Sequence, residues 1–192
     1  MTVLALDTET TGVHDNAEIA QLGMILYAPD RRVLGEFKSL ITPDGWTMPE
    51  ETQKFHTKNG STVSQENCER YGVSLNSALA LFNLWCRKAE TLVAFNTKYD
   101  LGRIRYSAGR IGVQLNLPHK TPCAMEMASE MMKLPATAKM VEWGHGNKFK
   151  NPKLGEAYEF ITMKKPQGAH DALADVRMAA EIYFTLIDME KK

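Results

Sequence analysis

The sequence predicts an α/β fold in which a mixed β-sheet is flanked by α-helices. The first 41 residues follow the pattern of strands, and from residue 74 helical patterns alternate with a buried strand. Strands followed by such an alternation favour a mixed sheet with helices packed against it. The 192 residues, 44% hydrophobic and 24% charged, suit a single domain that spans residues 1–192.

Three strands are expected near the start of the chain, at residues 3–7, 19–27 and 32–41. The first is an apolar run that ends in a carboxylate. A turn at Pro29-Asp30 joins the second strand to the third, which is typical of a β-meander. The following residues, 42–73, are irregular. We expect Pro49 to open one short helix there and Gly72 to end another.

A helix with one buried face is expected after residue 74. Asn76 is a plausible N-cap, and the apolar residues recur at helical spacing: Ala78, Leu81, Phe82 and Trp85. Residues 91–95, TLVAF, then form a buried strand, and residues 98–111 form another helix.

Three further helices complete the expected fold. Pro122 and Pro152 are each predicted to occupy the first position of a helix, where the missing N–H costs nothing. The last helix is expected to run from about residue 171 to 189.

Composition excludes several classes of protein. The cysteines lie far apart without a CxxC pair, and their number is odd: Cys68, Cys86 and Cys123. A structural zinc site and disulfides are therefore not expected. No apolar run approaches the roughly 18 residues that a membrane span needs, and no signal peptide is evident. We therefore expect a cytoplasmic protein with reduced thiols and no membrane association.

The net charge is zero, but the charges are unevenly distributed. Residues 133–165 contain seven lysines and three glutamates. If these lysines form one surface, that surface would attract a phosphate backbone. A solvated lysine surface without a nucleic-acid partner gives the same pattern.

The segment ALDTETTG, residues 5–12, carries the first candidate site. Side chains alternate between the faces of a strand, so Asp7 and Glu9 point the same way. Two carboxylates at this spacing, ~7 Å, repel each other unless a cation lies between them. Carboxylate oxygens suit Mg²⁺ or Mn²⁺. Gly12 then allows the chain to turn or to approach a ligand closely.

Two more acids stand at the starts of helices. Asp100 follows Asn96, which ends a buried strand, and it shares a face with apolar residues of its helix. Asp175 likewise heads an apolar stripe in the last helix, with His170 just upstream. Buried charge is costly unless it is paired or bound to metal, and histidine is a natural general base. Asp171 is the rival ligand.

Three motifs together resemble those of the DnaQ-like DEDDh 3′→5′ exonuclease family. They are ALDTETTG, the N-x-x-x-D of FNTKYD (95–100) and the H-x-x-x-x-D of HDALAD (170–175), in the family's order and spacing. The segment KLGEAYEF (153–160) also resembles the family. The resemblance implies the RNase H-like fold. This chain departs from the family at Phe95, at Tyr99 and in the loop FHTKNG (55–60).

The resemblance also implies a metal-dependent mechanism. Asp7, Glu9 and Asp175 would hold one divalent ion, Mg²⁺ or Mn²⁺. Asp7, with Asp100 through water, would hold a second. His170 would act as general base, and hydrolysis at a 3′ end would release a nucleoside 5′-monophosphate.

Single-stranded nucleic acid 3′ ends are the expected partner, with DNA favoured and RNA possible. Substrate contacts are predicted at Thr10, Thr11, Gly12, Asn96, Phe55 and His56. Bases entering a narrow site stack on aromatic rings, and five rings are candidates: Trp46, Phe55, Phe95, Tyr99 and Trp143.

Alternatives remain open. The chain could be a proofreading subunit bound to a DNA polymerase, although it stops three residues after Met189 and no partner-binding tail is expected. A homodimer is possible through a methionine-rich helix, although such a stripe is more often core. A non-catalytic nucleic-acid-binding module and an RNase H-type endonuclease are the remaining readings. The first of these would be expected to lose the acids, and the second does not explain His170.

Overall fold

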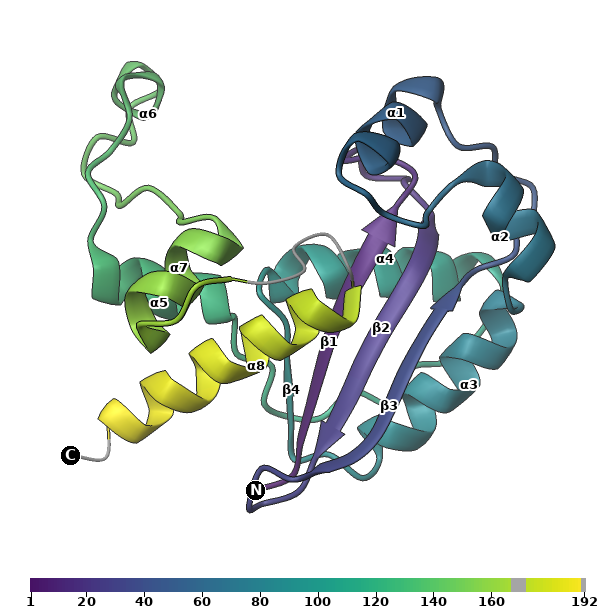
Figure 1. Cartoon of the computed structure of the whole chain (residues 1–192), viewed down its shortest axis with the longest axis horizontal. Coiled ribbons are helices and arrows are strands. Elements are labelled where there is room, and N and C mark those ends of the chain that lie inside the picture. The colour runs from purple at the N-terminus through teal and green to yellow at the C-terminus, as the bar shows by residue number, and fades with distance from the viewer. Residues whose placement is uncertain (167–171, 191–192) are drawn as a thin grey trace.

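The computed structural model describes residues 1–166 and 172–190, and within them four strands form one sheet in the order β3-β2-β1-β4 (Figure 1). The strands are β1 (Val3–Thr10), β2 (Ile19–Tyr27), β3 (Val33–Leu40) and β4 (Thr91–Val93). β2 runs antiparallel to both β1 and β3, whereas β4 runs parallel to β1. The predicted meander and mixed sheet are therefore confirmed.

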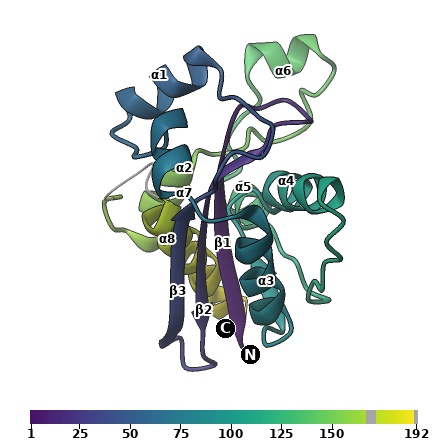
Figure 2. The same ribbon diagram turned by 90° about the vertical axis from the view of Figure 1, so that its right-hand side faces the viewer.

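Helices cover both faces of the sheet, as the edge-on view in Figure 2 shows. α3 and α4 pack on one face, and α8, with α5 and α7, packs on the other. α1 and α2 follow β3 in the chain, and Cys68 of α2 joins Ala20, Met48 and Val63 in a third, smaller buried cluster. The helices are α1 (Glu50–Lys58), α2 (Gln65–Tyr71), α3 (Leu75–Cys86), α4 (Thr97–Arg110), α5 (Ala124–Met132), α6 (Ala138–Glu142), α7 (Leu154–Thr162) and α8 (Ala172–Met189).

Alternation along β1 divides the core into two layers. Leu4 and Leu6 join the cluster under α3 and α4, while Val3 and Ala5 join the cluster under α8. Asp7 and Glu9 continue the second row, so their side chains emerge on the α8 face. β2 is buried at every position because helices lie on both of its faces.

The start of α3 differs from the prediction. Ser74, and not Asn76, is the N-cap, because its hydroxyl accepts a hydrogen bond from the Ser77 N–H at 3.1 Å. The helix therefore begins earlier. Its buried side is made by Leu75, Ala78, Leu79, Phe82 and Cys86, with Leu81 and Trp85 partly buried at its edge.

Neither proline expected at a first helical position lies there. Pro122 precedes α5 by two residues, because the chain from Lys120 to Cys123 is still extended and bridges to Thr91 and Ala94 beside β4. Pro152 precedes α7, whose N-cap is Lys153. By contrast, Pro49 and Gly72 bound α1 and α2 as predicted. Within the described residues, no helix is both long and apolar enough to cross a membrane.

Gly23 of β2 sets the distance between α8 and the sheet. It lies directly opposite Asp7 in the antiparallel register. A Cβ atom at Gly23 would lie 2.9 Å from the Ala172 Cβ and 3.1 Å from the Ala172 carbonyl carbon, at the first residue of α8. The missing side chain therefore lets the start of α8 approach the sheet beside Asp7.

We expect Gly23→Ala to destabilise the protein by about 1–3 kcal/mol, because the added methyl group must displace the backbone of α8. Urea unfolding followed by circular dichroism measures this change. Gly109→Ala is the matched control. Gly109 lies in α4, and a Cβ there would meet no atom within 4 Å, so the substitution should be neutral or stabilising by up to about 1 kcal/mol. Equal stability of the two variants would contradict this role of Gly23.

Candidate active site

Three carboxylates from two distant parts of the chain meet at the end of β1. Asp7, Glu9 and Asp175 each offer one oxygen, and these oxygens all lie within 4.8 Å of one another. The first two side chains come from alternate positions of β1, and the third comes from the first turn of α8. We call Asp7, Glu9 and Asp175 the acidic trio. Three of the four predicted acids are thus brought together.

Asp100 reaches the same region from the opposite face of the sheet. It lies in the first turn of α4 and is 4% exposed. Its Oδ1 atom accepts two hydrogen bonds from Thr8, from the backbone N–H at 3.0 Å and from Oγ1 at 2.7 Å. Because Thr8 stands between Asp7 and Glu9 in β1, this pair of hydrogen bonds fixes Asp100 against the strand that carries the trio. Asp100 itself lies outside the three closely spaced oxygens.

Burial and the proximity of other carboxylates both oppose ionisation within this group. Burial raises the pKa of Asp7 well above its usual value, and the charges of Asp100, Glu9 and Asp175 raise it further. Burial also raises the pKa of Asp100 to about 7, although the hydrogen bonds from Thr8 oppose the shift. The fold therefore holds carboxyl groups close together even though their proximity and burial oppose their ionisation. A bound divalent cation would offset the cost of ionising these groups. The donors are carboxylate oxygens, which suit a cation such as Mg²⁺ or Mn²⁺.

His170, the predicted general base, and its neighbour Asp171 lie outside the described residues. The structure therefore places four of the five predicted catalytic residues.

A cavity of about 520 Å³ opens beside Glu9. Its lining includes five of the six predicted substrate-binding residues: Thr10, Thr11, Gly12, Phe55 and His56. Thr10 ends β1, and Thr11 and Gly12 follow it directly. Phe55 and His56 belong to α1. The Thr52 hydroxyl donates to the Thr11 carbonyl at 3.0 Å and so ties α1 to this loop.

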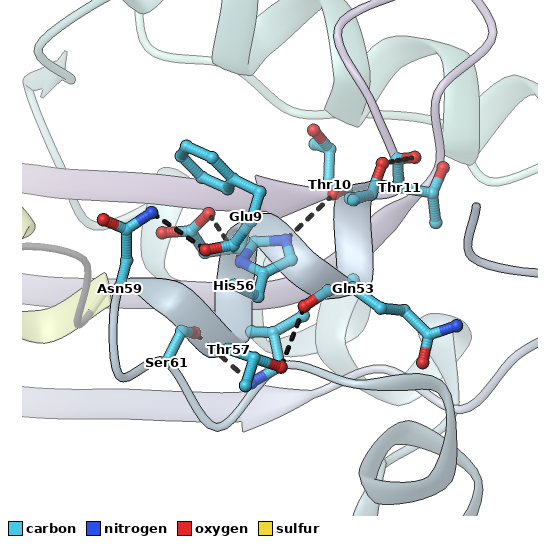
Figure 3. Close-up of polar contacts among 12 residues, drawn as sticks. Glu9, Thr10, Thr11, Gln53, His56, Thr57, Asn59 and Ser61 are labelled. Carbon is cyan, nitrogen blue, oxygen red and sulfur yellow. Dashed lines mark hydrogen bonds and ion pairs between the residues drawn. The ribbon is translucent and has the colours of Figure 1, made fainter. Parts of the chain in front are cut away.

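The ring of His56 lies between Glu9 and Thr10, as Figure 3 shows. Its Nδ1 atom is 3.8 Å from Glu9 Oε2, and its Nε2 atom is 3.4 Å from the Thr10 carbonyl oxygen. His56 is 3% exposed, whereas its neighbour Phe55 is 52% exposed. Of the two, Phe55 presents the larger accessible surface to a bound molecule.

Asn96 has a local role in the structure. It is the N-cap of α4, and its side chain accepts a hydrogen bond from the Tyr99 N–H at 3.4 Å. It is not among the residues that line the cavity. Its contact with substrate stays a prediction.

Tyr99 and Thr8 contribute more than the sequence indicated. The Tyr99 hydroxyl donates to the Gly12 carbonyl at 2.9 Å and lies 2.8 Å from Thr10 Oγ1, so it braces the turn after β1. Of the five aromatic candidates, Phe55 and Tyr99 line the cavity. Trp46 and Phe95 instead pack against the core. The signal for Thr8 was its place between two acids, where its side chain must face the other helix layer.

Residues 4–183 match the exonuclease family of RNase T type, which covers most of the chain. The chain belongs to this exonuclease family. The predicted resemblance is thereby confirmed, and the expected class of enzyme, a nuclease, agrees with the family. A search of curated proteins finds no match.

Solved structures share the fold at low sequence identity. Exonuclease I of E. coli in complex with a dA16 oligonucleotide is 17% identical, with a TM-score of 0.66, over 98% of this chain and 41% of that one. Cell-death related nuclease 4 is 18% identical, with a TM-score of 0.67, over 98% of this chain and 64% of that one. The chain thus spans less than two thirds of the length of these proteins. The predicted RNase H-like exonuclease fold is confirmed.

The raised pKa values of the acids predict an unusual pH dependence. Between the ordinary aspartate value of 3.8 and about 7, the folded metal-free protein holds a proton on Asp100 that the unfolded chain has lost. The contribution of Asp100 to stability is therefore present at low pH and is lost as pH rises through this window. Cation binding needs the ionised carboxylates, so added Mn²⁺ should stabilise the exonuclease more at about pH 8 than at about pH 5.

Thermal unfolding in EDTA and in Mn²⁺ at the two pH values measures both effects. Asp100→Asn cannot titrate at this position and serves as the reference. The stability of the wild type relative to this variant should fall from about pH 5 to about pH 8 in EDTA. A relative stability that rises over this range would contradict the burial of Asp100 described here.

Proposed function

We propose that this chain is a metal-dependent 3′→5′ exonuclease that releases nucleoside 5′-monophosphates from single-stranded nucleic acid, with DNA favoured over RNA. The observation that carries the proposal is the acidic trio beside a cavity, on the fold of the exonuclease family. A cavity of about 520 Å³ is of a size that suits one small ligand, such as a terminal nucleotide.

Two divalent ions, Mg²⁺ or Mn²⁺, complete the proposed site. Asp7, Glu9 and Asp175 would hold one ion, and Asp7 with Asp100 would hold the other. When bound, such a pair stabilises the charge that develops on the attacking and leaving oxygens of a phosphodiester. Their charge would also offset the burial and the neighbouring carboxylates that together raise the pKa of Asp7.

Groups of the protein itself would carry out proton transfer and position the substrate. His170 would accept the proton of the attacking water, for which a reference pKa of ~6.5 is suited near neutral pH. Phe55 would stack on the terminal base. The backbone from Thr10 to Gly12 would border the sugar, while Tyr99 holds this turn in place.

Solved structures of the same fold support the proposal of a single strand as the substrate. The E. coli Exonuclease I structures of this fold contain dA16 in one case and single-stranded DNA with zinc in another. The second structure is 16% identical to this chain, with a TM-score of 0.67, over 99% of this chain and 41% of that one.

A proofreading subunit bound to a polymerase and a homodimer remain compatible with the same site. A non-catalytic binding module is less favoured, because Asp7, Glu9, Asp100 and Asp175 are all present and are gathered at one end of β1. No observation favours an RNase H-type endonuclease over the exonuclease.

We expect Asp7→Asn and Asp175→Asn each to lower the rate of nucleotide release by at least about 100-fold, because each removes a ligand of the cation. His170→Ala should lower it by about 100- to 10,000-fold. The assay follows a 5′-labelled oligonucleotide in Mn²⁺, where 3′→5′ degradation gives a ladder of shortened products.

Asp188→Asn is the matched control, because it removes an acid from the far end of the same helix, where Asp188 pairs with Arg31 at the surface. It should retain the wild-type rate. Near-normal release by Asp7→Asn would contradict the proposal, and so would undiminished release in EDTA.

A circular single strand tests the requirement for an end. The exonuclease should leave the circle intact while it degrades the same sequence in linear form. Cleavage of the circle would instead favour the endonuclease.

A further inference from the structure

An exposed arm projects from the end of the molecule at which β1 terminates. It comprises residues 133–153 and carries α6 at its tip, and we call it the α6 arm. Figure 1 shows α6 held away from the sheet, and in both Figure 1 and Figure 2 it lies at the same end of the molecule as α1, which borders the cavity. No residue from 133 to 149 is buried. The arm therefore adds little to the core.

The arm is nevertheless an ordered structure in its own right. The Lys150 N–H donates to the Leu134 carbonyl at 3.0 Å and closes its base. At the tip, the Thr137 hydroxyl caps α6 by accepting from the Met140 N–H at 3.2 Å. The His145 N–H returns to the Met140 carbonyl at 2.8 Å. A segment that is fixed by its own hydrogen bonds and has no buried residue from 133 to 149 calls for a role outside the core.

The surface of the arm combines positive charge with exposed apolar groups. It contains five lysines and one glutamate, Glu142. Trp143 is 62% exposed and Val141 is 59% exposed. The Lys139 ammonium lies 4.5 Å from the centre of the Trp143 ring, so an aromatic ring and a cation are presented together.

This pairing fits single-stranded nucleic acid better than it fits a protein. A base stacks on an aromatic ring irrespective of sequence, and a lysine beside the ring meets the neighbouring phosphate. At the base of the arm, by contrast, Lys148 and Phe149 line a cavity of about 1000 Å³ that also contains Glu126, Glu130 and Glu190. These acids disfavour a phosphate backbone there and leave the tip as the binding surface.

We propose that the tip of the α6 arm, through Trp143 and Lys139, binds single-stranded nucleic acid at a distance from the scissile bond. This inference rests on the proposed function, because it places the arm on the part of the substrate that has not yet been degraded. The arm would hold long substrates between successive cleavages, and substrates too short to reach it would gain nothing from it.

The test measures binding and hydrolysis separately. Fluorescence anisotropy in EDTA gives the Kd for a single strand of about 20 nucleotides, a length that exceeds a single binding site of this kind. Trp143→Ala should weaken binding by about 5- to 100-fold, the range expected for loss of one stacked base. Lys139→Ala should also weaken it and should lower the slope of log Kd against log salt by about 0.7.

Two controls match these variants. Tyr71 is 61% exposed, and the Arg70 guanidinium lies 5.2 Å from the centre of its ring, but it belongs to α2. Lys88 is an exposed lysine just before β4. Tyr71→Ala and Lys88→Ala should bind as the wild type does. In Mn²⁺, all four variants should hydrolyse a trinucleotide at the wild-type rate, because the proposal places only the undegraded remainder of a longer strand on the arm.

Unchanged binding by Trp143→Ala and Lys139→Ala would overturn the proposal, and so would an equal loss in the two controls. Light scattering tests whether a second copy of the chain binds the arm. A wild-type dimer that Trp143→Ala converts to a monomer would overturn the proposal and assign the arm to self-association. Failure of the wild type to hydrolyse any substrate would count against the proposed function. Selective loss of binding in EDTA would still support the arm in that case.

Discussion

Negative charges from three elements repel one another at the end of β1, and the packing of the two helix layers holds them there. Burial raises the pKa of Asp7 most, and the charges of Asp100, Glu9 and Asp175 raise it further. Such an arrangement costs stability in the absence of a counter-charge. The fold supplies this stability through apolar contacts along β1, α4 and α8, and the divalent cation that we propose for this site would offset the cost of the acidic cluster.

Small features of the sheet decide whether the acids meet. Gly23 lets α8 approach close enough to bring Asp175 beside Asp7, and Thr8 holds Asp100 from the opposite face. His56 and Tyr99 then support Glu9 and the turn that follows β1. Each of these residues acts through its position. Because side chains alternate along β1, this strand of eight residues carries Asp7 and Glu9 on one face and holds Asp100 through Thr8 on the other.

Much of this arrangement could be predicted from local patterns. The period of two in β1 placed Asp7 and Glu9 on one face, and the apolar stripes behind Asp100 and Asp175 placed both acids on the buried sides of their helices. Helix starts were less predictable, because Pro122 lies in chain that bridges to β4 and Ser74 competes with Asn76 as a cap. The close approach at Gly23 depends on a partner about 150 residues away in the chain, which no local pattern can indicate.

A crystal structure of the protein soaked in Mn²⁺ tests the central claim most directly, because anomalous scattering locates the ion itself. We expect a strong peak among the carboxylates of Asp7, Glu9 and Asp175, and loss of this peak in Asp175→Asn. A peak at another group of residues, with the oxygens of this trio bound to protein groups alone, would contradict this claim.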